Sequence, residues 1–187
     1  MPHGEGMSTP TVHVAGPGEP APEAYYATRY AVLREPLGRP HGSERLPDDA
    51  TALHVWIEVD GVVVAVARGH LITGDGAAAD HAGPEAAQIP AFAPLSKDDA
   101  SLRPAVQVRQ MGVLEAWRGQ GFGALALEHL VRACVQTWNA RTGWLQAREG
   151  AIEFYAREGW VAFDPPYSIA GVGPHRSMWR RLDKLFD

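Results

Sequence analysis

Three glycines stand within six residues in the stretch RGQGFG, residues 118–123. An apolar segment with the pattern of a β-strand precedes them at 105–113, and a segment with the apolar spacing of a helix follows them. Glycine costs a helix or strand roughly 0.5–1 kcal/mol relative to alanine, but it permits positive φ and close approach of another group to the backbone. A strand, a glycine cluster and a helix in this order therefore predict a tight turn, a ligand at the helix N-terminus, or both.

Around this unit, the sequence predicts a mixed α/β fold without regular βαβ alternation. Strands are expected at 11–14, 53–59, 62–66, 105–113, 143–147, 160–163 and 175–182. Helices are expected at 22–35, from the glycines to 138, and at 151–159. Asp60-Gly61, between two apolar runs, is the signal of a type I′ hairpin. In the first helix, Tyr26, Tyr30 and Leu33 share one face, which predicts its buried side.

The length of the chain favours a single domain over 11–187, preceded by a flexible tail at 1–10. A stretch rich in Ala, Gly, Pro and Asp at 73–104 has no clear periodicity, which is unusual for a connection inside a compact domain. We expect this stretch to be an insertion, either a lid or a solvated excursion.

Composition argues against several classes of function. The formal net charge is −5 and no basic patch stands out, which argues against a nucleic-acid partner. No run of about 18 apolar residues is present, so no membrane span is expected. The first residues lack the basic and apolar segments of a secretory signal, and the single cysteine, Cys134, excludes an internal disulfide. These features predict a cytoplasmic protein.

The helix after the glycines offers unpaired N–H groups at the positive end of its dipole, which favours a phosphate ligand, and Arg118 adds a cation. A P-loop is excluded because no lysine lies between residues 98 and 183. The stretch GQGFGA at 119–124 matches the dinucleotide fingerprint, but the end of the next strand, at 143–147, lacks the acidic residue that should accompany it. A NAD-dependent oxidoreductase is therefore a remote alternative.

Two segments, taken together, indicate a family. The segment 108–127 resembles the acetyl-CoA-binding motif of the GCN5-related N-acetyltransferases (GNAT), usually written Q/R-x-x-G-x-G/A, with Arg118, Gly121 and Gly123 at its defined positions. The segment 150–160 resembles a later part of the same family, a short helix that carries a tyrosine and ends before a glycine-aromatic pair. The resemblance covers most of the chain outside the expected insertion.

This resemblance implies a mixed, mostly antiparallel central sheet with helices on both faces, splayed open between its fourth and fifth strands. It also implies acetyl-CoA as a co-substrate, with the pantetheine arm beside strand 105–113 and the pyrophosphate on the glycine stretch. The residues implied in this contact are Met111, Gly112, Val113, Arg118, Gly119, Gln120, Gly121, Phe122 and Gly123.

The resemblance further implies direct transfer of an acetyl group to a primary amine of a small molecule or peptide. Tyr155 stands where the family usually places the acid that protonates the leaving thiolate. Some members use a glutamate base on the strand before the glycines, but the matching residue here is Gln107, which cannot take a proton. Glu58 or Glu115 acting through water is an alternative, and His175, expected in a loop before the last strand, is a candidate residue of the substrate site.

The other histidines show no ligand spacing, so no metal is expected. The glutamine at position 107 favours a rival interpretation, a non-catalytic acyl-CoA-binding or sensing module on the same fold, whereas Tyr155 favours an enzyme. The sequence does not identify the amine, and a homodimer is left open.

Overall fold

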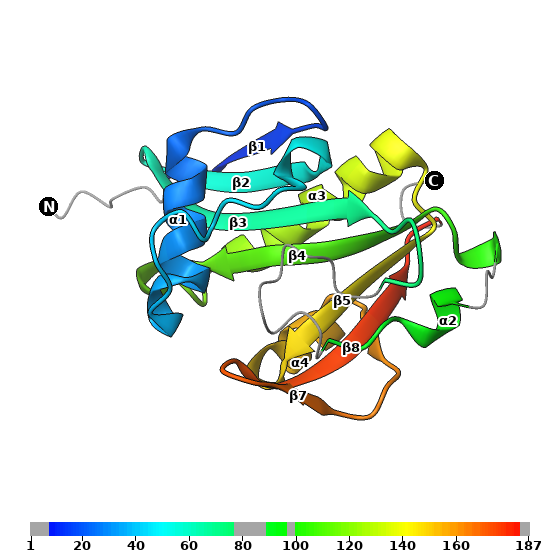
Figure 1. The fold of residues 1–187 in the computed structure, drawn as a ribbon. Coiled ribbons are helices and arrows are strands. Elements are labelled where there is room, and N and C mark those ends of the chain that lie inside the picture. The colour runs from blue at the N-terminus through cyan, green and yellow to red at the C-terminus, as the bar shows by residue number, and fades with distance from the viewer. Residues whose placement is uncertain (1–7, 77–88, 97–99, 184–187) are drawn as a thin grey trace, which may run out of the picture.

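The computed structural model describes residues 8–76, 89–96 and 100–183 (Figure 1). The strands are β1 (Thr11–Ala15), β2 (Leu53–Val59), β3 (Val62–Leu71), β4 (Ala105–Val113), β5 (Thr142–Arg148), β6 (Val161–Ala162), β7 (Tyr167–Ile169) and β8 (Gly173–Arg181). The helices are α1 (Glu23–Leu33), α2 (Ala93–Ser96), α3 (Phe122–Trp138) and α4 (Ile152–Arg157). Most of the expected tail and much of the expected insertion lie outside the described residues.

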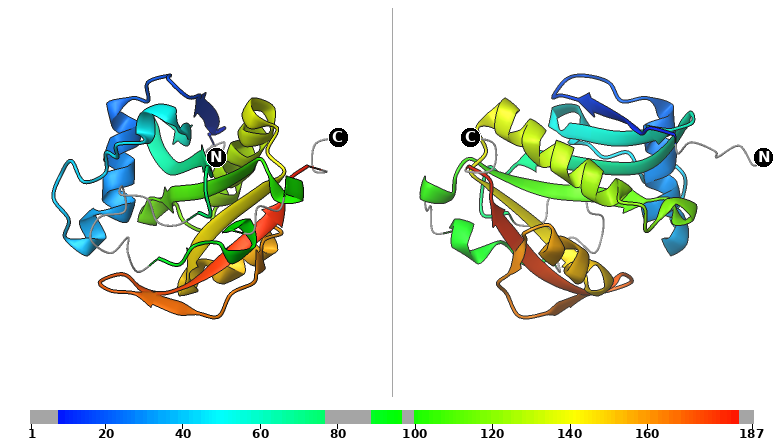
Figure 2. Two further views of the ribbon diagram at one scale, coloured as in Figure 1. Left: turned by 45° about the vertical axis from the view of Figure 1, so that its right-hand side comes forward. Right: turned by 180° about the vertical axis from the view of Figure 1, so that it is seen from behind.

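The strands form one open sheet of eight strands in the order β1-β2-β3-β4-β5-β8-β6, with β7 also paired to β8. Every pair is antiparallel except β4–β5, which is parallel. Helix α1 lies on one face of this sheet, and α3 and α4 lie on the other (Figure 2). The mixed, mostly antiparallel sheet with helices on both faces confirms the fold predicted from the sequence.

The β2–β3 hairpin turns as its sequence predicts. Asp60 and Gly61 both have positive φ, at 51° and 78°, as a type I′ turn requires. Both strands are buried along nearly their whole length, because α1 covers one face and α3 the other. The return strand β3 extends to Leu71, five residues beyond its predicted end. No helix in the described parts of the chain is long and apolar enough to cross a membrane.

Helix α1 buries a different face from the one predicted. Its buried residues are Tyr25, Thr28 and Arg29, while Tyr26 and Tyr30 are only partly buried. Polar contacts explain this difference. The Thr28 hydroxyl donates to the Val63 carbonyl at 2.7 Å, and the buried Arg29 forms an ion pair with Asp49. Hydrogen bonding therefore decides the orientation of this helix more than its apolar spacing does.

A buried ionic cluster joins three segments: helix α1, the loop that precedes β2, and strand β3. Arg29 and Arg68 have fully buried side chains, and both donate to Asp49 Oδ1 at 2.9 Å. Arg68 also donates to both carboxylate oxygens of Asp48, at 2.8 and 3.1 Å. Arg29 donates to the Tyr25 hydroxyl, which in turn lies 2.8 Å from His54 Nδ1. Paired and hydrogen-bonded in this way, the charges fix the loop that precedes β2 against the sheet.

We predict that Asp49→Asn destabilises the fold strongly, because it leaves two buried guanidinium groups with one carboxylate fewer. Loss of one partner from a buried ion pair typically costs about 3–5 kcal/mol. Glu23→Gln is the control: its exposed pair with Arg45 is expected to contribute less than about 1 kcal/mol. Chemical denaturation of the three proteins measures the difference, and equal stability of the two variants would contradict the role of the cluster.

The same aspartate predicts a pH dependence. Burial alone would raise the pKa of Asp49, but the Arg29 charge and hydrogen bonds from Leu46, Arg68 and Arg29 outweigh burial and lower it. The ionised Asp49 carboxylate therefore stabilises the fold fully above the pKa that Asp49 has in the unfolded chain. This stabilisation is lost as the pH falls through the lower pKa that Asp49 has in the folded protein. The stability gap between the parent protein and Asp49→Asn should accordingly shrink below about pH 4.

Candidate active site

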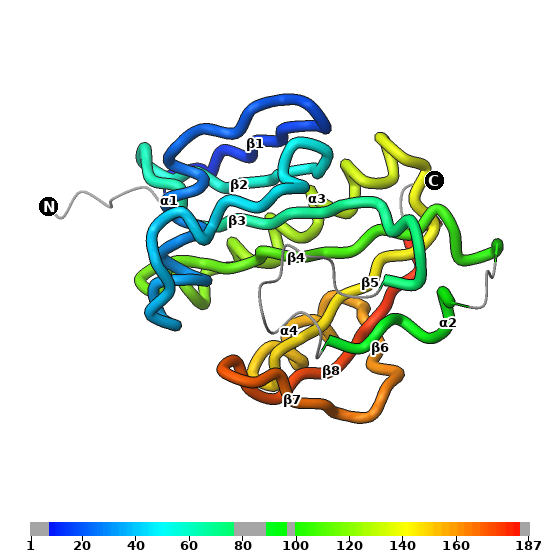
Figure 3. Tube along the Cα trace, in the orientation of Figure 1, coloured from blue at the N-terminus to red at the C-terminus, as the bar shows by residue number. Residues whose placement is uncertain are grey.

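Strands β4 and β5 separate after a short stretch of pairing. They pair only at Ala105–Thr142, Val106–Gly143 and Gln107–Trp144. Beyond this point β5 stays paired with β8 along its full length and diverges from β4 (Figure 3). The side-chain amide of Gln107 donates to Gln146 Oε1 at 2.8 Å, which links the two strands where they part. The predicted splay between the fourth and fifth strands is confirmed.

A β-bulge interrupts β4 beside this opening. Arg68 pairs with Arg109, whereas Val66 pairs with Gly112, so β4 has one residue more than β3 over this interval. Gln110 has a positive φ of 53°, which is uncommon for a residue other than glycine. Bulges of this kind redirect side chains and often lie next to active sites.

The bulge sends neighbouring side chains of β4 to different faces. Gln110 accepts a hydrogen bond from Arg34 Nη2 at 2.9 Å, on the side of α1. Met111 instead lies on the side of α4, where its sulfur accepts the Tyr155 hydroxyl at 3.4 Å. Because β5 has already diverged, the edge of β4 from 108 to 113 has no partner strand on that side among the described residues. Such an edge can pair with an extended ligand through its backbone.

The glycine stretch forms the turn between β4 and α3. Gly119 and Gly121 have φ values of 77° and 85°, which favour glycine, and no heavy atom lies within 4 Å of a Cβ built on either residue. The first N–H of α3 to bond within the helix is that of Leu125, so the N–H groups of 122–124 have no helical acceptor. The loop thus combines open space with donors at a helix N-terminus, which is a suitable place for a phosphate group.

Other residues predicted to bind the cofactor have structural roles as well. Arg118 Nε donates back to the Val113 carbonyl at 3.2 Å. A Cβ on Gly112 would lie 2.7 Å from Val32 Cγ2, so glycine at this position allows β4 to pack closely against α1. A Cβ on Gly123 would lie 3.4 Å from Val113 Cγ2, an ordinary contact distance between α3 and the strand.

Tyr155, on α4, faces the opening from the side opposite α1. Burial raises the pKa of its hydroxyl to about 12, with a smaller opposing effect from the charge of Arg148. The hydroxyl therefore keeps its proton throughout the neutral range. Its hydrogen bond to the Met111 sulfur shows that it already lies beside a thioether, a weak acceptor.

A cavity of about 460 Å³ lies at the opening, between the end of α1, β4, β5 and β8. His175 lines it from within β8. The strand predicted at 175–182 begins two residues earlier, at Gly173, so the placement of His175 in a loop before the strand was wrong. His175 Nδ1 lies 2.8 Å from the Gly173 carbonyl, which can only accept, so this nitrogen carries the hydrogen and Nε2 is the acceptor. Burial lowers the pKa of His175; the hydrogen bond to Gly173 partly opposes this effect, and the charge of Arg148 adds to it.

Neither alternative glutamate base lines this cavity. Glu58 is on β2, where its carboxylate lies 3.7 Å from His13 Nε2, and Glu115 is exposed before the glycine stretch. Cys134 is fully buried in α3, as expected of a core residue. Within residues 8–76, 89–96 and 100–183, no group of three or more His, Cys, Asp or Glu side chains could hold a metal ion.

Sequence patterns did not identify the arginines of the cavity, which are Arg34, Arg39, Arg109 and Arg148. They come from segments far apart in the chain, and no local pattern of the sequence marks them as a group.

Known proteins resemble this chain in sequence and in fold. The sequence model of the acetyltransferase (GNAT) family matches residues 20–160. YitI of Bacillus subtilis, described as an N-acetyltransferase, is 29% identical over 94 residues, and this match covers 50% of the chain and 62% of the relative's length.

Among solved structures, that of Escherichia coli ElaA has a TM-score of 0.66 at 20% identity and covers 92% of this chain and 99% of its own. A GNAT acetyltransferase from Elizabethkingia anophelis, solved with acetyl-CoA bound, has a TM-score of 0.53 at 11% identity and covers 92% of this chain and 98% of its own. At these identities the similarity concerns the fold alone.

We predict that Gly121→Val weakens binding of CoA, because its side chain would fill the open space beside the α3 N-terminus. Gly18→Val is the matched control, since Gly18 has nearly the same φ, at 83°, and also has no neighbour within 4 Å. Both variants should lose stability, by about 1–2 kcal/mol or more, from the left-handed backbone conformation. Only Gly121→Val should also lose CoA affinity in calorimetry of the folded protein, by tenfold or more. Equal affinity in the two variants would mean that this glycine serves only the turn.

Proposed function

The chain belongs to the acetyltransferase (GNAT) family, and we propose that it transfers the acetyl group of acetyl-CoA to a primary amine by direct attack, without a covalent enzyme intermediate. One observation carries the proposal: the edge of β4 from 108 to 113, which has no partner strand on one side among the described residues, leads to the glycine stretch and includes Met111, whose sulfur accepts the Tyr155 hydroxyl. The acetyl-CoA-bound GNAT neighbour shares this fold and supports the choice of co-substrate.

The residues present fit acetyl-CoA. The backbone of Met111 and Val113 would pair with the pantetheine arm, because no strand occupies this edge of β4 among the described residues. The N–H groups of 122–124 would hold the pyrophosphate, since they have no helical acceptor and lie at the positive end of the α3 dipole. The residues that we propose to contact acetyl-CoA are Met111, Gly112, Val113, Arg118, Gly119, Gln120, Gly121, Phe122 and Gly123.

Bound acetyl-CoA supplies a thioester carbon that a neutral amine can attack directly. In the balanced reaction, the new C–N bond replaces the C–S bond, the amine nitrogen gives up a proton, and the leaving sulfur gains one. Tyr155 would supply the proton to sulfur, because its raised pKa keeps it protonated and its hydroxyl already lies beside the sulfur of Met111.

The attacking amine must lose a proton, and this step needs an acceptor other than Tyr155. Gln107 cannot serve, because a side-chain amide does not take up a proton in the neutral range; its nitrogen instead donates to Gln146. We assign this role to His175, directly or through water. It lines the cavity, its Nε2 is the acceptor nitrogen, and its lowered pKa keeps it neutral at pH 7.

A second candidate function is a non-catalytic acyl-CoA-binding or sensing module, which the glutamine at position 107 favours. Turnover separates the two functions. Acetyl-CoA is incubated with a panel of amines, and the released thiol and the acetylated amine are both measured. Stoichiometric release of thiol with formation of an amide supports the enzyme, whereas acetyl-CoA binding without turnover supports the sensing module.

Ligand-induced stabilisation tests the choice of co-substrate. We predict that acetyl-CoA raises the melting temperature by several degrees and that NAD does not, because a ligand at 100 times its Kd adds about 2.7 kcal/mol to stability. Stabilisation by NAD alone would contradict the proposal and restore the dinucleotide interpretation of the glycine stretch.

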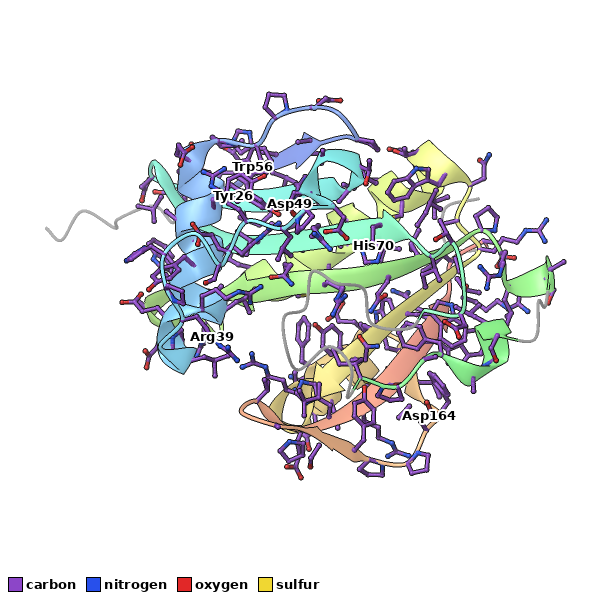
Figure 4. The ribbon with its side chains drawn as sticks, in the orientation of Figure 1. Tyr26, Arg39, Asp49, Trp56, His70 and Asp164 are labelled. Atoms are coloured by element: carbon purple, nitrogen blue, oxygen red, sulfur yellow. The ribbon has the colours of Figure 1, made fainter. Side chains whose placement is uncertain are left out.

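We predict that Tyr155→Phe lowers kcat by about 10²-fold, the lower end of the range for general acid catalysis, because thiolate is a tolerable leaving group. The CoA affinity should change little, since the aromatic ring and its packing remain. Tyr26→Phe is the matched control, because Tyr26 lies on α1 away from the opening (Figure 4). Steady-state rates at saturating acetyl-CoA measure the effect, and a Tyr155→Phe rate within about threefold of the parent would remove Tyr155 from the catalytic role.

A further inference from the structure

Positive charge is concentrated in the cavity on the α1 side of the opening. Arg34 and Arg39 come from the end of α1 and the loop after it, Arg109 from β4, and Arg148 from the end of β5. No aspartate or glutamate is among the described residues that line this cavity. The concentration is opposite in sign to the chain as a whole, whose formal net charge is −5.

We propose that the amine acceptor carries an anionic group, a carboxylate or a phosphate, which these arginines bind. The proposal rests on the proposed function, because it takes the cavity to be the acceptor site of an acetyltransferase. The planar guanidinium group suits both anions, since its parallel N–H groups can form two hydrogen bonds with either.

The hydrogen bonds that Arg34 donates do not neutralise its charge. Arg34 donates to neutral acceptors, the Ser43 carbonyl at 3.1 Å and the Gln110 side chain at 2.9 Å. Burial, and then the charges of Arg29, Arg39 and Arg148, lower the pKa of Arg34, and Glu44 only partly opposes them. Cations placed this close to one another favour the binding of an anion among them.

Two carboxylates whose charges act on these arginines also accept hydrogen bonds from groups outside the cavity. Asp48 accepts two hydrogen bonds from Arg68, and Glu44 accepts one from the Gly42 N–H at 2.7 Å. Burial lowers the pKa of Arg109 to about 10, and the charge of Arg68 adds to this effect while Asp48 opposes it. Arg109 is therefore still charged at pH 7.

Arg148 is the arginine best placed to receive a ligand. It is exposed at the end of β5, and no described residue forms a hydrogen bond or ion pair with it. Its charge nevertheless reaches Tyr155 and His175, because it lowers the pKa of both. An anionic group bound at Arg148 would therefore lie near the two residues proposed for proton transfer.

The remaining lining of the cavity defines the rest of the acceptor. It is largely apolar, with Leu33, Leu37, Val108, Met111, Ile169 and Val172. A volume of about 460 Å³ is within the usual range for a small-molecule site. We therefore expect a small amine with an apolar body and an anionic group.

Binding of the CoA phosphates is the competing explanation for these arginines. Two features argue against it for the residues near α1. Figure 4 shows Arg39 just beyond the end of α1, and Figure 2 shows α1 on the face of the sheet opposite α3. The glycine stretch begins α3, so a phosphate held there lies on the other face.

Matched amines test the proposal. Phenylalanine, its phosphonate analogue, its methyl ester and phenethylamine share one apolar body and differ in the anionic group. We expect kcat/KM to be at least tenfold higher for the carboxylate or the phosphonate than for phenethylamine, and the faster of the two identifies the preferred anion. The ester controls for amine reactivity: its amine is less basic and more often neutral, so reactivity alone would make it the better acceptor, whereas recognition of the anion makes it worse.

Variants at the two ends of β5 test whether Arg148 causes the preference for anionic amines. Arg148→Gln should raise KM for the anionic amine about tenfold or more and change KM for phenethylamine much less, whereas Arg148→Lys should retain part of the preference. Arg141→Gln is the matched control, because Arg141 is exposed just before the opposite end of β5, away from the cavity. An equal loss of CoA affinity and acceptor affinity in Arg148→Gln would mean that this arginine serves CoA, and would overturn the proposal.

Binding without turnover separates this inference from the proposed function. Calorimetry of the same amines in the presence of CoA, which has no acetyl group to transfer, measures acceptor affinity alone. Tighter binding of the anionic amines supports the inference even if no amide forms, in which case only the proposed catalysis fails. Acetylation of phenethylamine as fast as phenylalanine and its phosphonate, with equal binding, overturns the inference and leaves the proposed function intact.

Discussion

The short parallel pairing of β4 with β5 is the constraint on which the rest of the structure depends. Two neighbouring strands that remained paired would leave no opening in the sheet, and two that never met would divide the protein into separate halves. Here three residue pairs hold the sheet together at one end, and the Gln107–Gln146 hydrogen bond marks the point where it opens. An unpaired strand edge has an energetic cost, so each half of the sheet must be stabilised by other contacts.

The half that contains β5 is held by aromatic packing. Trp144 is almost completely buried between Trp179, Phe92 and Phe163, with ring centroids 5.3–5.5 Å away. A Cβ on Gly143 would lie 2.7 Å from Trp160 Cη2, so glycine at this position lets a second indole pack against the strand. The half that contains β4 packs against α3 through apolar side chains and also contains the ionic cluster under α1. The core under α3 includes Leu145 and Met178 of the other half, so apolar packing joins the two halves on that face of the sheet.

Local rules predicted much of this architecture. The β2–β3 turn, the bounds of β4 and the helix from the glycine stretch to Trp138 follow from turn residues and apolar periodicity, which act over a few residues. The bulge at Gln110 could not be predicted, because it depends on the register between β3 and β4. The burial of Arg29 depends on Asp49, and the grouping of Arg34 with Arg148 depends on the path of the whole sheet. The resemblance to a known family singled out the glycine stretch and Tyr155 from the sequence alone, whereas the positive charge of the cavity depends on the folded chain.

The position of the opening between two faces of one sheet has a consequence for inhibition. If the co-substrate occupies the α3 side and the amine the α1 side, neither has to pass through the place of the other. A compound confined to the arginine-lined cavity would then compete with the amine alone, and high cellular concentrations of acetyl-CoA would not displace it. A compound that spanned the gap beside Gln107 would occupy both sides, and its selectivity among related enzymes would come from the part of the molecule that faces α1.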